Sequence, residues 1–95
     1  MKRPLHILTA EAVIPGVLKV VWSDGYEGIV DIRGLLKAGP ILKPLQDADY
    51  FRSVEVDAFG HSIYWGEEYA EDVDFGCDRL REMAEDQAAL LAKAS

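Results

Sequence analysis

The clearest alternation of hydrophobic and polar residues covers residues 17–31, where two apolar stretches flank the polar segment Ser23-Asp24-Gly25. Successive side chains of a strand point to opposite faces, so this pattern predicts two strands joined by a tight turn. A two-residue turn at Asp24-Gly25 would place acidic side chains among apolar ones, whereas a three-residue loop leaves one face apolar throughout. Because a one-residue slip exchanges the faces, we predict the three-residue loop, closed by Gly25 in the left-handed conformation. The cross-strand pairs that follow are Trp22 with Tyr26, Val20 with Gly28 and Leu18 with Val30, and the opposite face carries Lys19, Val21, Glu27, Ile29 and Asp31.

Three further strands complete the predicted sheet. Residues 5–13 alternate in a way typical of a strand, and the turn Pro15-Gly16 joins them to the hairpin. A second hairpin is predicted from residues 53–57 and 62–65, which flank a turn at residues 58–61. In the first strand, one face is expected to hold Ile7, Thr9, Glu11 and Val13, and the other Leu8, Ala10 and Ala12.

Helical signals fall at two places. Asp31 is expected to cap a short helix over residues 32–38, which Gly39-Pro40 would end. Residues 41–50 predict an irregular connection, and residues 66–74 predict an acidic loop. From residue 76 to residue 92 the spacing is helical. The apolar face expected of that helix holds Cys77, Leu80, Ala84, Gln87 and Leu91.

Together these elements predict an α+β fold in a single domain over residues 1–95. Two hairpins and the N-terminal strand form a mostly antiparallel sheet, and the C-terminal helix covers its apolar face. The residues expected in the core are Leu18, Val20, Trp22, Val30, Val54, Val56, Ile63, Trp65 and Leu80.

The charge of the chain limits its expected partners. The formal net charge is −7 and the pI is about 4.6, and lysine and arginine do not cluster, which disfavours direct contact with nucleic acid or with an anionic membrane. A basic protein partner is compatible with this charge. One cysteine excludes an intrachain disulfide, and neither a signal peptide nor a membrane-spanning stretch is evident, so we expect a cytoplasmic protein.

Candidate chemistry is sparse. No grouping typical of a catalytic or cofactor site is apparent, so no catalytic residue, metal ligand or cofactor is predicted. The densest set of carboxylates spans residues 67–78, and such oxygens suit Ca²⁺ or Mg²⁺, but the alternating spacing of a calcium loop is absent. His6, His61 and Cys77 lack the short spacing of a zinc motif, and Cys77 is expected to be a packing residue.

An ordered series of short motifs resembles a known family. The series comprises Trp22-Ser23-Asp24-Gly25, Val30-Asp31-Ile32, Leu45-Gln46-Asp47 with Phe51, Val54-Glu55-Val56-Asp57, Ile63-Tyr64-Trp65, and Asp72-Val73-Asp74 before Asp78-Arg79-Leu80. Over residues 13–80 it is similar to the small bacterial family catalogued as domain of unknown function 2442. Gly66 departs from the family, which usually has a proline there, and the segment 67–71 is longer than usual. The resemblance implies no established activity; some members carry an added helix-turn-helix domain, and some are encoded beside small toxin-like proteins.

We therefore expect a non-enzymatic protein-interaction module, antitoxin-like or adaptor-like. The residues expected to bind its partner are Tyr64, Glu67, Glu68, Glu71, Asp72 and Asp74, which combine an outward-pointing aromatic ring with the acidic loop. The alternative is a small-ligand or divalent-metal binding protein that uses the carboxylates of residues 67–78 with His61 or Tyr64. A homodimer is also expected, because residues 5–13 lie toward a sheet edge whose backbone groups are open to pairing.

Overall fold

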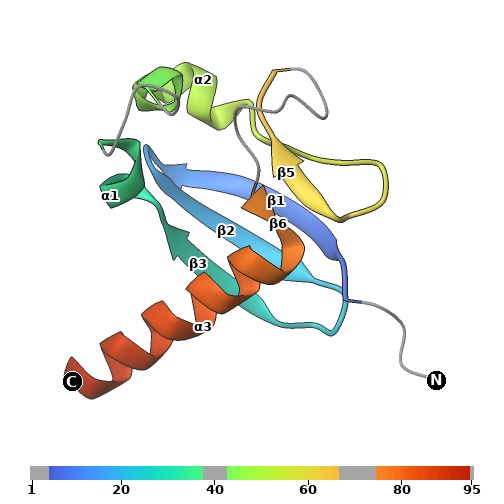
Figure 1. The fold of residues 1–95 in the computed structure, drawn as a ribbon, viewed down its shortest axis with the longest axis vertical. Coiled ribbons are helices and arrows are strands. Elements are labelled where there is room, and N and C mark those ends of the chain that lie inside the picture. The colour runs from blue at the N-terminus through green and yellow to red at the C-terminus, as the bar shows by residue number, and fades with distance from the viewer. Residues whose placement is uncertain (1–4, 38–42, 67–74, 95) are drawn as a thin grey trace.

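The computed structural model describes residues 5–37, 43–66 and 75–94, and it confirms the α+β class (Figure 1). A three-stranded antiparallel sheet lies beside a smaller three-stranded sheet, with short helices at one end and a long C-terminal helix against the larger sheet. In chain order the elements are β1 (Ile7–Ile14), β2 (Val17–Trp22), β3 (Glu27–Asp31), α1 (Arg33–Leu36), the 3₁₀ turn η1 (Lys43–Gln46), α2 (Ala48–Arg52), β4 (Glu55–Val56), β5 (Ser62–Tyr64), β6 (Phe75–Gly76) and α3 (Cys77–Ala94).

The β2–β3 hairpin has the predicted register. Leu18 lies opposite Val30 and Val20 opposite Gly28. The backbone N–H of Trp22 donates to Tyr26 O at 2.9 Å. Gly25 adopts a φ of +91°, which the three-residue loop requires and which side chains disfavour. Choosing the register that keeps one face apolar therefore identified the correct loop.

The predicted faces of β1 are wrong for Ile7, because the strand is bulged. Ile7 lies opposite Trp22, whereas Thr9 lies opposite Val21, so β1 has one extra residue between these pairs. An extra residue reverses the alternation beyond it. Ile7 is therefore buried on the same side as Ala10 and Ala12, and Leu8 is exposed.

The second hairpin is confirmed, and a strand that the sequence did not indicate extends it. Glu55 pairs with Tyr64 and Val56 with Ile63. That strand is β6, which follows the expected acidic loop, and its Phe75 pairs with Ile63 of β5. Asp57 follows β4, and its buried carboxylate accepts hydrogen bonds from the amides of Phe59 and His61. The turn is thus held from inside by a carboxylate.

The segment between the hairpins is more regular than predicted. The first helix is confined to α1, and the connection expected to be irregular contains η1 and α2. The side chain of Asp47 accepts from the amides of Asp49 and Tyr50 and so caps α2. Gln46 Nε2 donates to Leu36 O at 2.7 Å and fastens η1 to α1. These contacts hold the short helices together at one end of the domain.

The core lies between the larger sheet, α3 and the smaller sheet. Of the nine residues expected there, Val56 is partly buried and the other eight are buried. The core also includes Ile7, Ile32, Leu36, Leu45, Phe51, Phe75, Cys77 and Ala84.

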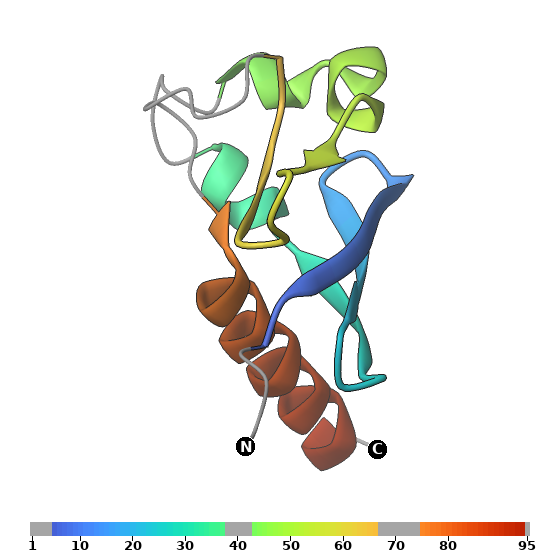
Figure 2. The same cartoon turned by 90° about the vertical axis from the view of Figure 1, so that its right-hand side faces the viewer.

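The two edges of the larger sheet differ. The sheet order is β1-β2-β3, so β1 lies at an edge as predicted. However, β4 and α2 contact β1, and Ile7 N donates to Gly60 O at 2.8 Å. At the other edge, α3 extends past β3 toward its C-terminus (Figure 1). Figure 2 shows α2 at the end of the molecule opposite to the C-terminus of α3.

Candidate interaction surface

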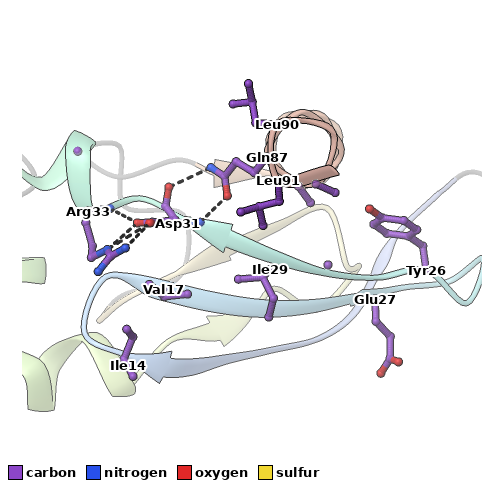
Figure 3. A pocket seen from close by; sticks show the side chains of 14 residues that line it. Ile14, Val17, Tyr26, Glu27, Ile29, Asp31, Arg33, Gln87, Leu90 and Leu91 are labelled. Atoms are coloured by element: carbon purple, nitrogen blue, oxygen red, sulfur yellow. Dashed lines mark hydrogen bonds and ion pairs between the residues drawn. The ribbon is translucent and has the colours of Figure 1, made fainter. Parts of the chain in front are cut away.

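A groove of about 980 Å³ lies between the last turns of α3 and the outer side of the larger sheet (Figure 3). Its apolar lining comes from the β1–β2 turn region, β3 and α3. The apolar residues are Ile14, Val17, Ile29, Ala84, Ala88, Leu90 and Leu91, and the principal polar ones are Tyr26, Glu27, Asp31, Arg33 and Gln87.

Strand register explains why aliphatic side chains gather on this outer face. Ile14 pairs with Val17, and Val17 pairs with Asp31, so these residues form one row across the sheet. Ile29 stands two residues before Asp31 and therefore points to the same side. The face opposite the core thus carries an apolar strip.

The aliphatic side chains around the groove are unusually open to solvent. The exposed fractions are 51% for Ile14, 50% for Ile29, 67% for Leu90 and 73% for Leu91. Single exposed hydrophobic residues are common, but several around one concave surface mark an interaction site. The groove is therefore the strongest candidate interaction surface in the described part of the chain.

Gln87 fixes α3 against the open edge of β3. Its Oε1 accepts from Asp31 N at 2.8 Å and its Nε2 donates to Asp31 O at 3.0 Å. The side-chain amide therefore takes the place of a neighbouring strand at this one residue. The contact separates the part of α3 that packs on the core from the part that continues beyond it.

An ion pair closes one end of the groove. The Arg33 guanidinium donates to both carboxylate oxygens of Asp31, at 2.7 Å for the shortest contact. The Arg33 guanidinium lowers the pKa of Asp31, and the carboxylate raises the pKa of Arg33. A side chain at Gly16 would place its Cβ 2.5 Å from Arg33 Cγ, so this glycine gives Arg33 its position.

A second charged contact lies at the other end. The Arg81 guanidinium stacks over the ring of Tyr26, with its Cζ 3.9 Å from the ring centroid. Arg81 Nη1 donates to Asp24 Oδ1 at 3.0 Å, and this hydrogen bond lowers the pKa of the Asp24 carboxyl. The tip of the first hairpin is thereby attached to α3.

Of the predicted partner-binding residues, the structure describes Tyr64, which does not line this groove. Tyr64 is half-buried, and its hydroxyl donates to Glu55 Oε2 at 2.8 Å across the second hairpin. The other members of the predicted set, Glu67, Glu68, Glu71, Asp72 and Asp74, lie outside the described residues. Their role in binding stays a prediction.

The structure also shows where two of the candidate soft-metal ligands lie. Cys77 is buried at the start of α3, as expected, and burial raises the pKa of its thiol. His61 is exposed and stacks on Phe59, with ring centroids 5.7 Å apart. Within residues 5–37, 43–66 and 75–94, no three His, Cys, Asp or Glu side chains form a group that could hold a metal ion.

The sequence pattern indicates some of the residues that line the groove. The predicted pattern places Ile29 on the mostly charged face of the hairpin and Leu91 on the apolar face of the last helix. An aliphatic residue among charged ones on an outer face is one such indication. That these two residues, 62 positions apart, border one groove depends on how α3 crosses β3.

The chain belongs to the family described as protein of unknown function (DUF2442), whose model matches residues 12–85. This confirms the resemblance seen in the sequence motifs. A search of curated proteins found no match.

A solved structure shares the fold. It is the crystal structure from Nitrosomonas europaea ATCC 19718 described as a "Putative DNA Binding Protein", with 27% sequence identity and a TM-score of 0.75. The match covers 94% of this chain and 56% of the Nitrosomonas chain. The present chain thus spans little more than half the length of that protein.

This match contradicts the expectation that direct contact with nucleic acid is excluded. That expectation was based on the net charge and on the lack of clustered lysine and arginine along the sequence. Neither shows how charges are distributed over the surface, whereas DNA meets only one face of a protein. In the described part of the chain, no helix is long and apolar enough to cross a membrane.

Proposed function

We propose that this chain is a protein-interaction module that binds its partner through the groove between α3 and the outer face of the larger sheet. The observation that carries the proposal is the gathering of Ile14, Ile29, Leu90 and Leu91 around one apolar surface that the fold leaves open. Burying these side chains against a partner would remove apolar area from water, at about 25 cal/mol per Å².

Side-chain contacts define both ends of the groove. Arg33 and Asp31 close one end, and Tyr26 under Arg81 forms the other. A preformed surface loses little conformational entropy when a partner binds. These contacts support binding of a protein surface that presents aliphatic side chains.

The roles expected from the sequence, antitoxin-like or adaptor-like, remain finer proposals within this function. Both roles need a stable surface that recognises another protein, which the groove supplies. The acidic residues 67–74 would add electrostatic steering toward a basic partner.

Affinity capture from the native host tests the proposal. The tagged chain should retain a partner in stoichiometric amount, and Ile29→Glu should lose it because a carboxylate enters the apolar strip. Leu8→Glu is the matched control, since Leu8 is 52% exposed on β1 and does not line the groove. Equal capture by both variants would overturn the groove as the binding surface.

A second candidate function is DNA binding, which the Nitrosomonas match favours. Residues 32–53 contain four basic and two acidic residues, for a net charge of +2, whereas the other 73 residues carry −9. Lys37 and Lys43 are exposed at this end of the molecule, beside α1 and η1. Among the described residues around the short helices, basic side chains therefore outnumber acidic ones.

Fluorescence anisotropy with labelled duplex DNA over a salt series tests this second candidate. Binding through Lys37 and Lys43 should weaken with salt, and Lys37→Glu with Lys43→Glu should reduce the logarithmic salt slope by about 2. Arg79→Glu, an exposed charge on α3, serves as the control. Absence of binding at low salt, or a slope unchanged in the double variant, would reject DNA contact at this face.

A further inference from the structure

Beyond Gln87, α3 ends in a helical tail, residues 88–93, that the domain itself does not cover. Residues 87–92 carry no charge, and Leu90 and Leu91 are 67% and 73% exposed. By contrast, Leu80 and Ala84 of the same helix are buried. The tail therefore presents an apolar convex surface to solvent.

The tail lies directly beside the groove, because Leu90 and Leu91 form part of the groove wall (Figure 3). One face of the molecule thus carries both a convex apolar element and a concave apolar one. A two-fold interface uses the same patch on both subunits, so the patch must fit itself. A groove adjoining a projecting apolar helix meets that requirement.

Charge also favours contact between copies at this surface. The charged residues that line the groove are Glu27, Asp31 and Arg33, which sum to −1, and the tail carries one positive charge on Lys93. The groove and the tail of a second copy therefore carry opposite charges. Together they form a patch with no net charge, on a chain whose net charge is −7. Repulsion between copies comes from charges elsewhere and is screened beyond about 8 Å at physiological salt.

We infer that the occupant of the groove is a second copy of this chain, with each copy placing its α3 tail in the groove of the other. This inference rests on the proposed function and names the partner. It moves the expected dimer contact from β1, which β4 and α2 contact, to the β3 side of the sheet. In such a dimer, Leu90 and Leu91 of each copy would be buried against Ile14 and Ile29 of the other copy, at two equivalent contacts.

Sedimentation equilibrium of the purified full chain tests the inference. The wild-type chain should shift from the 10.6 kDa monomer to twice that mass between low micromolar and submillimolar concentration. Leu91→Lys and Ile29→Glu should each raise the dimer dissociation constant about thirtyfold or more, as loss of a central interface side chain does. Leu8→Glu should leave it unchanged.

Mixing the two variants distinguishes a dimer in which each tail enters the other copy's groove from dimers formed through other surfaces. In the mixed dimer, one tail–groove contact still places Leu91 against Ile29, and the other joins a lysine at position 91 to a glutamate at position 29. The mixture should therefore recover dimers, seen as a mixed mass by native mass spectrometry, whereas each variant alone remains monomeric. Far-UV circular dichroism checks that both variants fold.

Three results would overturn the inference. They are a wild-type monomer at every concentration, a dimer that survives both substitutions, and a mixture that stays monomeric. Capture of a different protein through an intact groove by a monomeric chain would refute self-association and leave the proposed function standing. Loss of both capture and dimerisation would reject both.

Discussion

The two halves of α3 differ in how far their side chains are buried. Cys77, Leu80 and Ala84 lie in the core, whereas Leu90 and Leu91, one to two turns further on, are exposed. The pairing of Gln87 with the backbone of Asp31 marks the boundary. One helix thus contains a segment fixed by packing and a segment that packing does not explain.

The difference shows that helix formation and burial have separate causes here. Helical stability in proteins comes mostly from packing of an apolar face, which accounts for the first half. The second half is rich in alanine, which has the highest helix propensity, so it continues the helix without help from the domain. Its leucines are not needed for that purpose, which is why we assign them to a contact with another chain.

The largest expected effect is the difference between substitutions in the two halves of α3 in how much they lower the free energy of unfolding. Leu80→Ala should lower the free energy of unfolding by about 2–5 kcal/mol, because it opens a cavity at a fully buried position. Leu91→Ala should change the unfolding of the monomer by no more than about 0.5 kcal/mol, as exposed positions do. Urea denaturation below the concentration at which the chain associates measures both.

The contrast fails if Leu91→Ala destabilises the monomer as much as Leu80→Ala does. That result would mean that the tail packs on its own domain. A parallel measurement of Leu90→Ala, which is exposed to a similar extent, would show whether the whole tail behaves in this way.

A smaller effect tests how closely the first half approaches the sheet. A Cβ at Gly28 would lie 2.8 Å from Ala84 Cβ and 3.0 Å from the Tyr26 ring. Gly28→Ala should therefore destabilise the fold by about 1–3 kcal/mol through overpacking. Gly34→Ala is the control, because nothing lies within 4 Å of a Cβ there, and thermal unfolding should show no loss. Equal melting temperatures for the two variants would mean that α3 lies further from β3.

The sequence predicted the fold where the signal is local. The register of the β2–β3 hairpin followed from the alternation around Ser23-Asp24-Gly25, and Leu80 was placed in the core from helical spacing. Asp47 could also have been recognised as a helix cap, since its carboxylate accepts from two amides of α2. That signal was missed because the helix is only five residues long.

Features that depend on distant contacts were not predicted. The bulge in β1 arises from pairing with β2, and β6 exists because Phe75 meets Ile63 across the smaller sheet. The groove needs Ile14, Ile29 and Leu91 together, and no local pattern fixes the angle at which α3 crosses β3. The expectation about DNA was based on charges read along the sequence, which do not show how those charges are distributed over the surface.

Gln87 allows the boundary between the halves to be tested. Gln87→Ala removes both hydrogen bonds to Asp31 and should cost about 1 kcal/mol. Hydrogen exchange at the amide of Asp31 should accelerate, while exchange at Val20 in the central strand should change only with global stability. Unchanged protection of Asp31 would show that the tail is held by contacts other than this amide pair.

The smallest effect concerns the charged contact that fastens the first half of α3 to the hairpin tip. Hydrogen bonding to Arg81 lowers the pKa of Asp24 in the folded protein. A carboxyl whose pKa is lowered by folding stabilises the fold fully above its unfolded value of about 3.9 and loses this contribution as the pH falls through the folded value. Arg81→Gln should therefore raise the pKa of Asp24 toward its usual value and flatten the loss of stability below about pH 4.

An NMR titration of the side-chain carboxyl groups measures this effect with an internal control. Arg33 lowers the pKa of Asp31 from the other end of the groove, so the titration of Asp31 should be the same in Arg81→Gln as in the wild type. An Asp24 pKa that does not move would mean that Arg81 stacks on Tyr26 without pairing with the hairpin in solution. The first half of α3 would then be held by the burial of Cys77, Leu80 and Ala84 and by the backbone hydrogen bonds of Cys77, whose carbonyl accepts from Trp22 Nε1 and whose amide donates to His61 O.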